Sequence, residues 1–82
     1  MTPAATERAV REILQEITLS GDCLRAPREM GLETMGVDSV GMIELVFALE
    51  ERFSIRILED EVAPENFSSI ESLTSLVARK CL

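Results

Sequence analysis

The segment GVDSVGMIELVFALEERF, residues 36–53, decides how the chain folds and where its chemistry lies. Asp38 and Ser39 are both residue types that cap the N-terminus of a helix, and the apolar residues after them recur at helical spacing. We therefore predict a helix over residues 39–53. Ser39 has two interpretations at this point. It caps the helix, or its hydroxyl is held at the electropositive helix end for chemistry.

The predicted helix carries apolar residues on two opposite sides. The side expected to face the core holds Met42, Leu45, Val46, Leu49 and Phe53. The other side mixes apolar and acidic residues, namely Val40, Ile43, Phe47, Glu44, Glu50 and Glu51. Apolar anchors ringed by carboxylates are typical of a surface that docks a basic protein. The alternative is a helix buried on both sides, for which so short a chain offers little covering protein.

Length and charge limit the classes of function. The chain has 82 residues, of which 46% are apolar, and a net charge of −7. This predicts a single domain, residues 1–82, with a small aliphatic core. Residues 38–71 hold nine acidic and two basic side chains, a balance that repels nucleic acid and anionic membranes and suits a basic protein partner. The simpler interpretation of these acids is a set of solvated helix faces.

Residues 1–37 predict one further helix and a long loop. Thr2 is a good N-cap, and Pro3 suits the first helical position. The buried stripe would comprise Val10, Ile13, Leu14 and Ile17, and Ser20-Gly21-Asp22 would end the helix. The loop over residues 20–37 is expected to be ordered, with its apolar residues Leu24, Met30, Leu32 and Met35 holding it to the core.

The last third of the chain predicts a short and a longer helix. Ile55 and Ile57 would lie in a turn whose isoleucines enter the core, and Glu59-Asp60-Glu61 would open a short helix that Pro64 limits. A capping box with Ser68 at the N-cap and Glu71 three residues on predicts a final helix that ends near Arg79-Lys80. Its buried stripe is Ile70, Leu73, Leu76 and Val77. The fold class is therefore all-α, a small antiparallel four-helix bundle with three longer helices, one short helix and a long loop between the first and second.

Several kinds of chemistry are not expected. The chain has no histidine, so Ser39 has no usual base of its own, and another protein must activate it if it reacts. No phosphate-binding glycine loop, metal-ligand cluster or calcium-loop spacing occurs, so we expect neither catalysis nor a metal site. Cys23 and Cys81 are interpreted as incidental thiols of a reducing compartment, although two cysteines could also form one disulfide. No signal peptide or membrane-spanning run is visible, which indicates a cytoplasmic protein.

These residues also resemble a known family. Gly36-Val37-Asp38-Ser39-Val40 is similar to the Asp-Ser-Leu attachment motif of acyl carrier proteins. The similarity continues through Glu44-Leu45, residues 48–53 and Ile57, and resumes over residues 59–61 and 67–70. It covers residues 34–77 strongly, and residues 1–33 only through a generic amphipathic helix and a long loop. Asp-Ser plus a hydrophobe is a weak motif alone, whereas the same motif followed by this acidic helix is specific.

The resemblance implies a function and its partners. A phosphopantetheinyl transferase, with a magnesium ion, would attach 4′-phosphopantetheine from coenzyme A to Ser39, which Asp38 and Val40 flank. The terminal thiol would hold an acyl or aminoacyl group as a thioester. Partner enzymes with basic patches, such as loading, ketosynthase or tailoring enzymes, would read Val40, Glu44, Phe47, Glu50 and Glu51. Core roles would fall to Leu45, Leu49, Phe53 and Ile57. The protein is expected to be a freestanding monomer.

Three departures from the family pattern bear on the pathway. Val40 stands where leucine is usual, Met35 stands where leucine often precedes the glycine, and Gly41 lies in the first turn of the helix. They leave the attachment site intact and favour a specialised pathway, polyketide or aminoacyl, over primary fatty-acid synthesis. Two alternatives stay open: an aminoacyl or peptidyl carrier of a nonribosomal pathway, and a non-catalytic acidic adaptor that only docks a basic partner.

Overall fold

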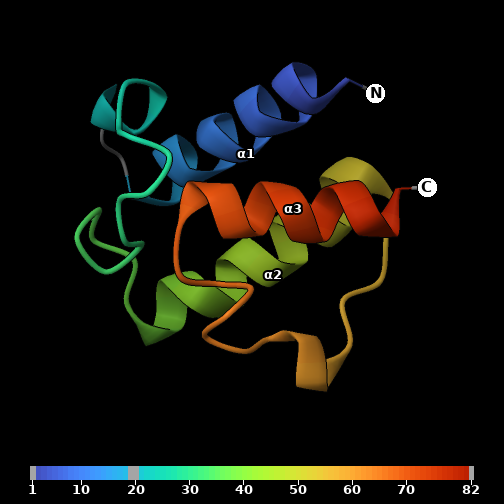
Figure 1. Ribbon diagram of the computed structural model, residues 1–82. Helices are drawn as coiled ribbons and strands as arrows, with labels where there is room; N and C mark the ends of the chain where they lie inside the picture. The colour runs from blue at the N-terminus through green and yellow to red at the C-terminus, as the bar shows by residue number, and fades with distance from the viewer. Residues whose placement is uncertain (1, 19–20, 82) are drawn as a thin grey trace.

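The computed structural model describes residues 2–18 and 21–81 and shows an all-helical domain (Figure 1). Three α-helices, α1 (Pro3–Thr18), α2 (Ser39–Phe53) and α3 (Ile70–Lys80), are joined by two segments that each contain a short 3₁₀ helix, η1 (Gly21–Leu24) and η2 (Glu59–Glu61). Within the described part of the chain, extended pairing is limited to one isolated bridge between Gly31 and Ser69. The predicted all-α class is confirmed, and the predicted short third helix is the single 3₁₀ turn η2.

Helix α1 packs against both α2 and α3. Its N-terminus is capped as predicted, because the Thr2 hydroxyl accepts a hydrogen bond from the Ala5 N–H at 3.2 Å. α1 runs antiparallel to α2: Glu12 forms an ion pair with Arg52 near one end, while Ile17 lies beside Gly41 at the other. Ser20 of the predicted stop signal lies outside the described residues.

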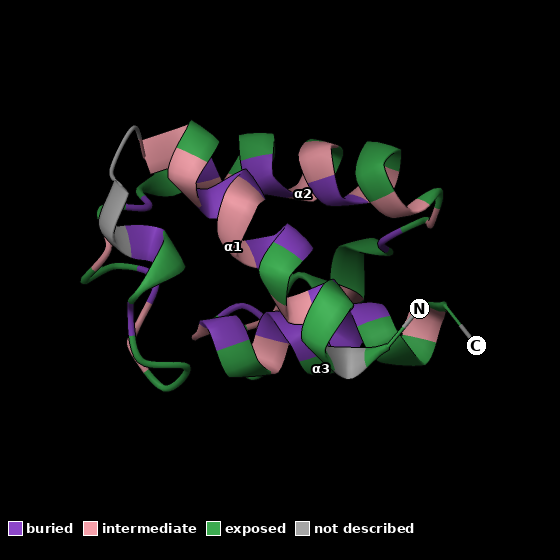
Figure 2. Ribbon diagram, turned by 90° about the horizontal axis from the view of Figure 1, so that it is seen from above, coloured by how far each residue is buried: buried purple, intermediate pink, exposed green. Residues whose placement is uncertain are grey.

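The core is formed by the predicted stripes. Figure 2 shows the buried sides of the three α-helices turned toward one another. Ile70, Leu73, Leu76 and Val77 of α3 are all at most 1% exposed, as are Val10 and Leu14 of α1 and Leu45 and Leu49 of α2. Ile57 is also buried, whereas Phe53 and Ile55 are partly buried and pack against the core. Aliphatic side chains thus fill the interior, as the composition predicted.

The described part of the loop between α1 and α2, residues 21–38, packs against the core, but its anchors differ from the prediction. Leu32 is buried and Met30 and Met35 pack against the core, whereas Leu24 is 43% exposed. The η1 turn directs Cys23 inward instead, at 1% exposure, and Ala26 is also buried. The prediction that Leu24 holds the loop is therefore wrong, because the η1 turn directs Cys23 into the core and leaves its neighbour Leu24 on the outer side.

A charged side chain of α1 fixes this loop to the helix. Nη1 of Arg11 donates to the backbone oxygens of Ala26, at 2.6 Å, and Cys23, at 3.2 Å. Further along, the Glu71 N–H donates to the Arg28 oxygen and the Leu32 N–H to the Ser68 oxygen, both at 3.0 Å. The loop is thus tied to both α1 and α3.

The cap of α3 lies one residue later than predicted. Ser69, not Ser68, is the N-cap, and its hydroxyl accepts from the Ser72 N–H at 3.2 Å. Ser68 stays outside the helix because its carbonyl oxygen accepts from Leu32 and its neighbour Ser69 pairs with Gly31. Glu71, the predicted second half of the box, is replaced by Ser72, whose hydroxyl accepts from the Ser69 N–H at 3.0 Å.

Both cysteines are free thiols, as expected: Cys23 is buried beside the Thr18 hydroxyl, and Cys81 is exposed. Across the described ranges, no helix is long and apolar enough to cross a membrane, and no group of three or more candidate side chains is placed to hold a metal ion.

Gly41 yields the first prediction, because this residue lets α1 approach the start of α2. A Cβ atom there would lie 3.3 Å from Asp38 Oδ1, 3.5 Å from Ile17 and 3.5 Å from Val37. We expect Gly41→Leu to lower the free energy of unfolding by about 1–3 kcal/mol through overpacking. Urea denaturation measures this. Glu44→Leu, at an exposed site of the same helix, should change stability by less than about 0.5 kcal/mol. Equal stability of the Gly41 variant and wild type would contradict the packing described.

Glu61 yields the second prediction. Its carboxylate accepts from Lys80 Nζ at 2.7 Å and from the Leu58 N–H at 2.9 Å, so it ties η2 to the end of α3. The Lys80 contact and then the Leu58 hydrogen bond lower the pKa of Glu61 below its ordinary value of 4.5. A lowered carboxyl pKa stabilises the fold at neutral pH, and this contribution is lost as the pH falls below that ordinary value.

We therefore expect wild type to be more stable than Glu61→Gln at about pH 7, and the stability gap to narrow as the pH falls below 4.5. Because the pair is near the surface, added salt should narrow the gap. Chemical denaturation at a series of pH values measures both effects, with Glu65→Gln as the exposed control. A gap that is independent of pH would show that the ion pair is not responsible.

Candidate functional site

The site is built around the first residue of α2. Asp38 is the N-cap of this helix, and its Oδ1 accepts from the Gly41 N–H at 2.7 Å. Ser39 is therefore the first helical residue and not the cap, so the interpretation of Ser39 as the capping residue is wrong. Because its neighbour satisfies the helix end, the Ser39 side chain is not needed for capping, and the residue is exposed.

The segment before Ser39 is held in place by the core. Val37 is 4% exposed, and its N–H donates to the Leu32 oxygen at 3.0 Å. Gly36 has φ of 99°, a left-handed conformation that favours glycine, and so turns the chain from the loop toward α2. Val37 is thus buried two positions before the exposed Ser39, and its contacts with the core position the start of α2.

The electrostatics at Ser39 suit a phosphate ester. The first backbone N–H groups of a helix have no partner within the helix and point toward its N-terminus, where they stabilise negative charge. A phosphate on the Ser39 oxygen would lie beside these groups in α2. The residues present therefore fit the covalent attachment of a phosphate-linked group at Ser39.

The outer face of α2 is exposed as the pattern predicts. Val40, Ile43 and Phe47 are 64%, 59% and 65% exposed, although all three are large hydrophobic residues. Glu44 and Glu51 lie exposed among them. We call these five residues the α2 outer face. The alternative of a helix buried on both sides is excluded by these values.

Glu50 differs from the other predicted docking residues. Its Oε2 accepts from the Ile57 N–H at 2.9 Å, and the residue is only half-exposed. This contact helps to direct the chain after α2, where Ser54 takes a left-handed conformation with φ of 54°. Glu50 therefore has a structural role that the helical pattern did not indicate.

Two apolar hollows adjoin the α2 outer face. One, of about 250 Å³, is lined by Met42, Ile43, Val46, Phe47, Glu59 and Val62. The other, of about 360 Å³, is lined by Leu32, Glu33, Met42, Val62, Ala63, Pro64, Phe67 and Ser68. Met42 and Val62 contribute to both, so we refer to the two together as the apolar groove. The sequence analysis did not predict a role for Val62, which is 40% exposed. The feature that could have indicated it is an apolar residue directly after the acidic residues 59–61.

Comparisons with known proteins agree with this geometry. Residues 8–78 match the family model described as the phosphopantetheine attachment site. Aminoacyl carrier protein 2 of Bradyrhizobium diazoefficiens is 32% identical over 68 residues, which are 83% of this chain and 73% of that protein. Aminoacyl carrier protein 1 of the same organism is 31% identical over 85% of this chain and 74% of its own length. The acyl carrier protein of Campylobacter hominis is 29% identical over 79% of this chain and 78% of its own.

The family model covers most of the chain, including the whole of α2 with its exposed serine. The group that this family attaches is phosphopantetheine. Members of this family act as non-catalytic carriers. The chain therefore belongs to the family of phosphopantetheine-binding carrier proteins.

Proposed function

We propose that Ser39 is the residue that carries the 4′-phosphopantetheine arm. A phosphopantetheinyl transferase with a magnesium ion would join the Ser39 oxygen to the arm's phosphate, and the nucleotide part of coenzyme A would leave. The arm supplies a terminal thiol that holds cargo as a thioester. The observation that carries this proposal is the exposed position of Ser39 at the start of α2, with the capping role taken by Asp38.

The proton of the Ser39 hydroxyl must be removed by a base of the transferase. The chain has no histidine, and the carboxylate of the adjacent residue, Asp38, accepts a hydrogen bond from the Gly41 N–H. A side chain that is committed to the cap is poorly placed to act as a general base. The protein is thus a substrate for modification, which accords with a non-catalytic carrier.

We propose that partner enzymes bind the α2 outer face. Exposed apolar side chains supply affinity, and the carboxylates of Glu44 and Glu51 orient a basic partner. This face borders Ser39, so a partner that docks there is positioned to receive the arm. The cytoplasmic location and monomeric state expected from the sequence remain predictions.

Two classes of cargo have support. The apolar groove beside α2 favours an acyl group, because an alkyl chain gains about 0.8 kcal/mol for each CH₂ that it buries. The two Bradyrhizobium relatives named aminoacyl carrier proteins favour an aminoacyl group. Intact mass of the protein purified from its native host would report the cargo and so separate the two.

Modification of Ser39 is the third prediction. With coenzyme A, magnesium and a transferase of broad specificity, wild type should gain one phosphopantetheine mass, and Ser39→Ala should gain none. Ser75→Ala, which removes an exposed hydroxyl from α3, should be modified like wild type. Intact-mass spectrometry measures the result. A wild-type chain that stays unmodified with several transferases would favour the adaptor alternative.

The α2 outer face yields the fourth prediction. Phe47→Ala and Glu44→Lys should each reduce the kcat/KM of the transferase for this protein by about tenfold, equivalent to about 1.4 kcal/mol of lost interaction. Glu16→Lys makes the same charge change at an exposed position on α1 and is expected to have a much smaller effect. If all three variants are modified as fast as wild type, the face does not dock this enzyme.

A further inference from the structure

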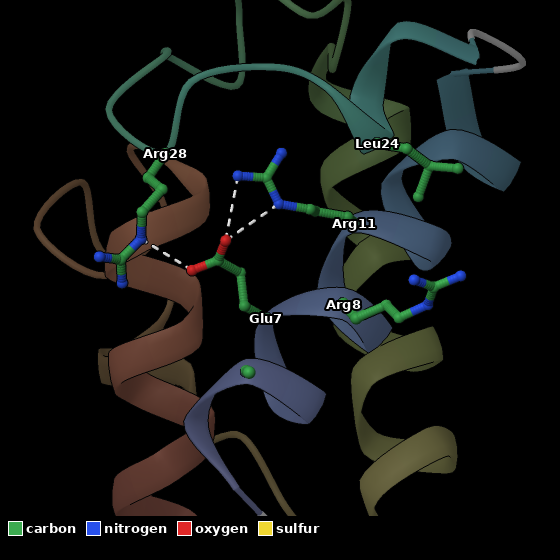
Figure 3. Close-up of a pocket in the computed structure, with 6 residues that line it drawn as sticks. Glu7, Arg8, Arg11, Leu24 and Arg28 are labelled. Carbon is green, nitrogen blue, oxygen red and sulfur yellow. Dashed lines mark hydrogen bonds and ion pairs between the residues drawn. The ribbon is translucent and has the colours of Figure 1, made fainter.

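We propose that a basic cleft between α1 and the loop that follows it is a second docking surface, which binds an acidic segment of a partner protein. The cleft has a volume of about 560 Å³ and is lined by Ala4, Glu7, Arg8, Arg11, Leu24 and Arg28. Figure 3 shows these side chains at the junction of α1 with the loop. Three arginines and one glutamate line this cleft in a chain whose net charge is −7.

The floor of the basic cleft is held by hydrogen bonds and ion pairs. The Arg11 side chain is only 13% exposed, and its guanidinium pairs with Glu7 and donates to the Cys23 and Ala26 oxygens. Glu7 in turn pairs with Arg28 through Nε at 2.7 Å (Figure 3). One carboxylate is thus shared by two guanidinium groups. The loop side of the cleft is held in a fixed position before any partner arrives, which lowers the entropic cost of binding.

Two arginines of the cleft remain accessible for a ligand. The Arg8 side chain is 77% exposed, and its contact with Glu12 is a loose ion pair of 3.6 Å. The Arg28 side chain is 52% exposed and uses Nε for Glu7, and its terminal nitrogens make no hydrogen bond or ion pair with the side chains that the structure describes. A guanidinium presents paired N–H groups that match the two oxygens of a carboxylate.

The apolar part of the lining favours a peptide segment over a small anion. Leu24 is a large hydrophobic residue that is 43% exposed, and Ala4 contributes a second apolar surface. A segment that presents acidic side chains and an apolar residue on one face would contact both the arginines and Leu24. Nucleic acid and anionic membranes would also be attracted to the arginines. Both carry negative charge over a wide area, so the acidic remainder of the chain repels them more than a short segment that carries two acidic residues.

The cleft is separate from the site on α2. None of its lining residues belongs to α2, and none of the α2 outer face lines it. A partner bound in the cleft would leave Ser39 accessible, so the protein could be held by one partner while another acts on the arm. Only this consequence rests on the proposed function; binding in the cleft does not.

The test uses ¹⁵N-labelled full-length protein and an amidated helical peptide of about 15 residues. The peptide carries glutamates one turn apart with leucine on the same face, and a second peptide replaces glutamate by glutamine. We expect the acidic peptide to shift the backbone amides of residues 4–11 and 24–28 in a saturable manner. The shifts should disappear at about 1 M salt, where charges are screened beyond about 3 Å. The glutamine peptide should not produce them.

Variants separate the cleft from general charge attraction. The double variant Arg8→Gln with Arg28→Gln should weaken binding of the peptide by about tenfold. The control double variant, Arg25→Gln with Arg56→Gln, removes two exposed charges outside the cleft and should change the affinity for the peptide by less than about twofold. Leu24→Ser, which keeps every charge, should also weaken binding. Thermal melts confirm that each variant is folded. Ser39→Ala should bind the peptide like wild type, so a failure of the proposed function leaves this result unchanged.

Several outcomes would overturn the proposal. They are shifts centred on α2, equal binding of the glutamine peptide, equal loss in the cleft and control variants, and no saturable shift with the acidic peptide. Tighter binding of a single-stranded oligonucleotide or of phosphatidylglycerol vesicles at the same amides would also overturn it, because the cleft would then select phosphate and not a protein segment.

Discussion

The hydrogen bond from the Gly41 N–H to the Asp38 carboxylate, 2.7 Å long, is the contact on which the site depends. A helix N-terminus must satisfy its free N–H groups, and here the residue before the serine does so. Ser39 is thereby placed in the first turn without a capping duty. Val37, the residue before the cap, is buried in the core. Gly41, the residue that donates to the cap, has no side chain, so Ile17 of α1 can pack closely against it. The position of one exposed hydroxyl is thus set by the core beneath it.

The small size of the domain explains why its surface is specialised. Each α-helix turns one stripe into a shared core, and 82 residues leave little protein to cover anything else. On α2 the uncovered side is apolar at its centre and acidic around it. On α1 and the adjacent loop it is basic, with Leu24 exposed among arginines. The two surfaces differ in charge and share no residue, so the two docking proposals are independent of each other.

Much of the fold was predictable because long helices repeat their apolar residues every three or four positions. The bounds of α2 and the buried stripes of α1 and α3 followed from that spacing. The errors lie where distant segments meet. Ser69, which pairs with Gly31, replaces Ser68 as the cap of α3. Leu24 is exposed because a 3₁₀ turn directs Cys23 inward. The sequence also has two good capping residues, Asp38 and Ser39, side by side. It therefore indicated the candidate site, but it did not show which of the two residues caps the helix. The contact of Glu50 with Ile57 and those of Arg11 with the loop join residues whose spacing carries no periodic signal.

The most direct test of this account compares the stabilities of Asp38→Ala and Ser39→Ala by urea denaturation. Loss of an N-cap side chain costs about 0.5–2 kcal/mol, whereas loss of an exposed first-turn hydroxyl costs almost nothing. Asp38→Ala should therefore be destabilised by this amount, whereas Ser39→Ala should unfold like wild type. The reverse result, with Ser39→Ala the destabilised variant, would show that the Ser39 hydroxyl caps the helix and is not available for attachment of the arm.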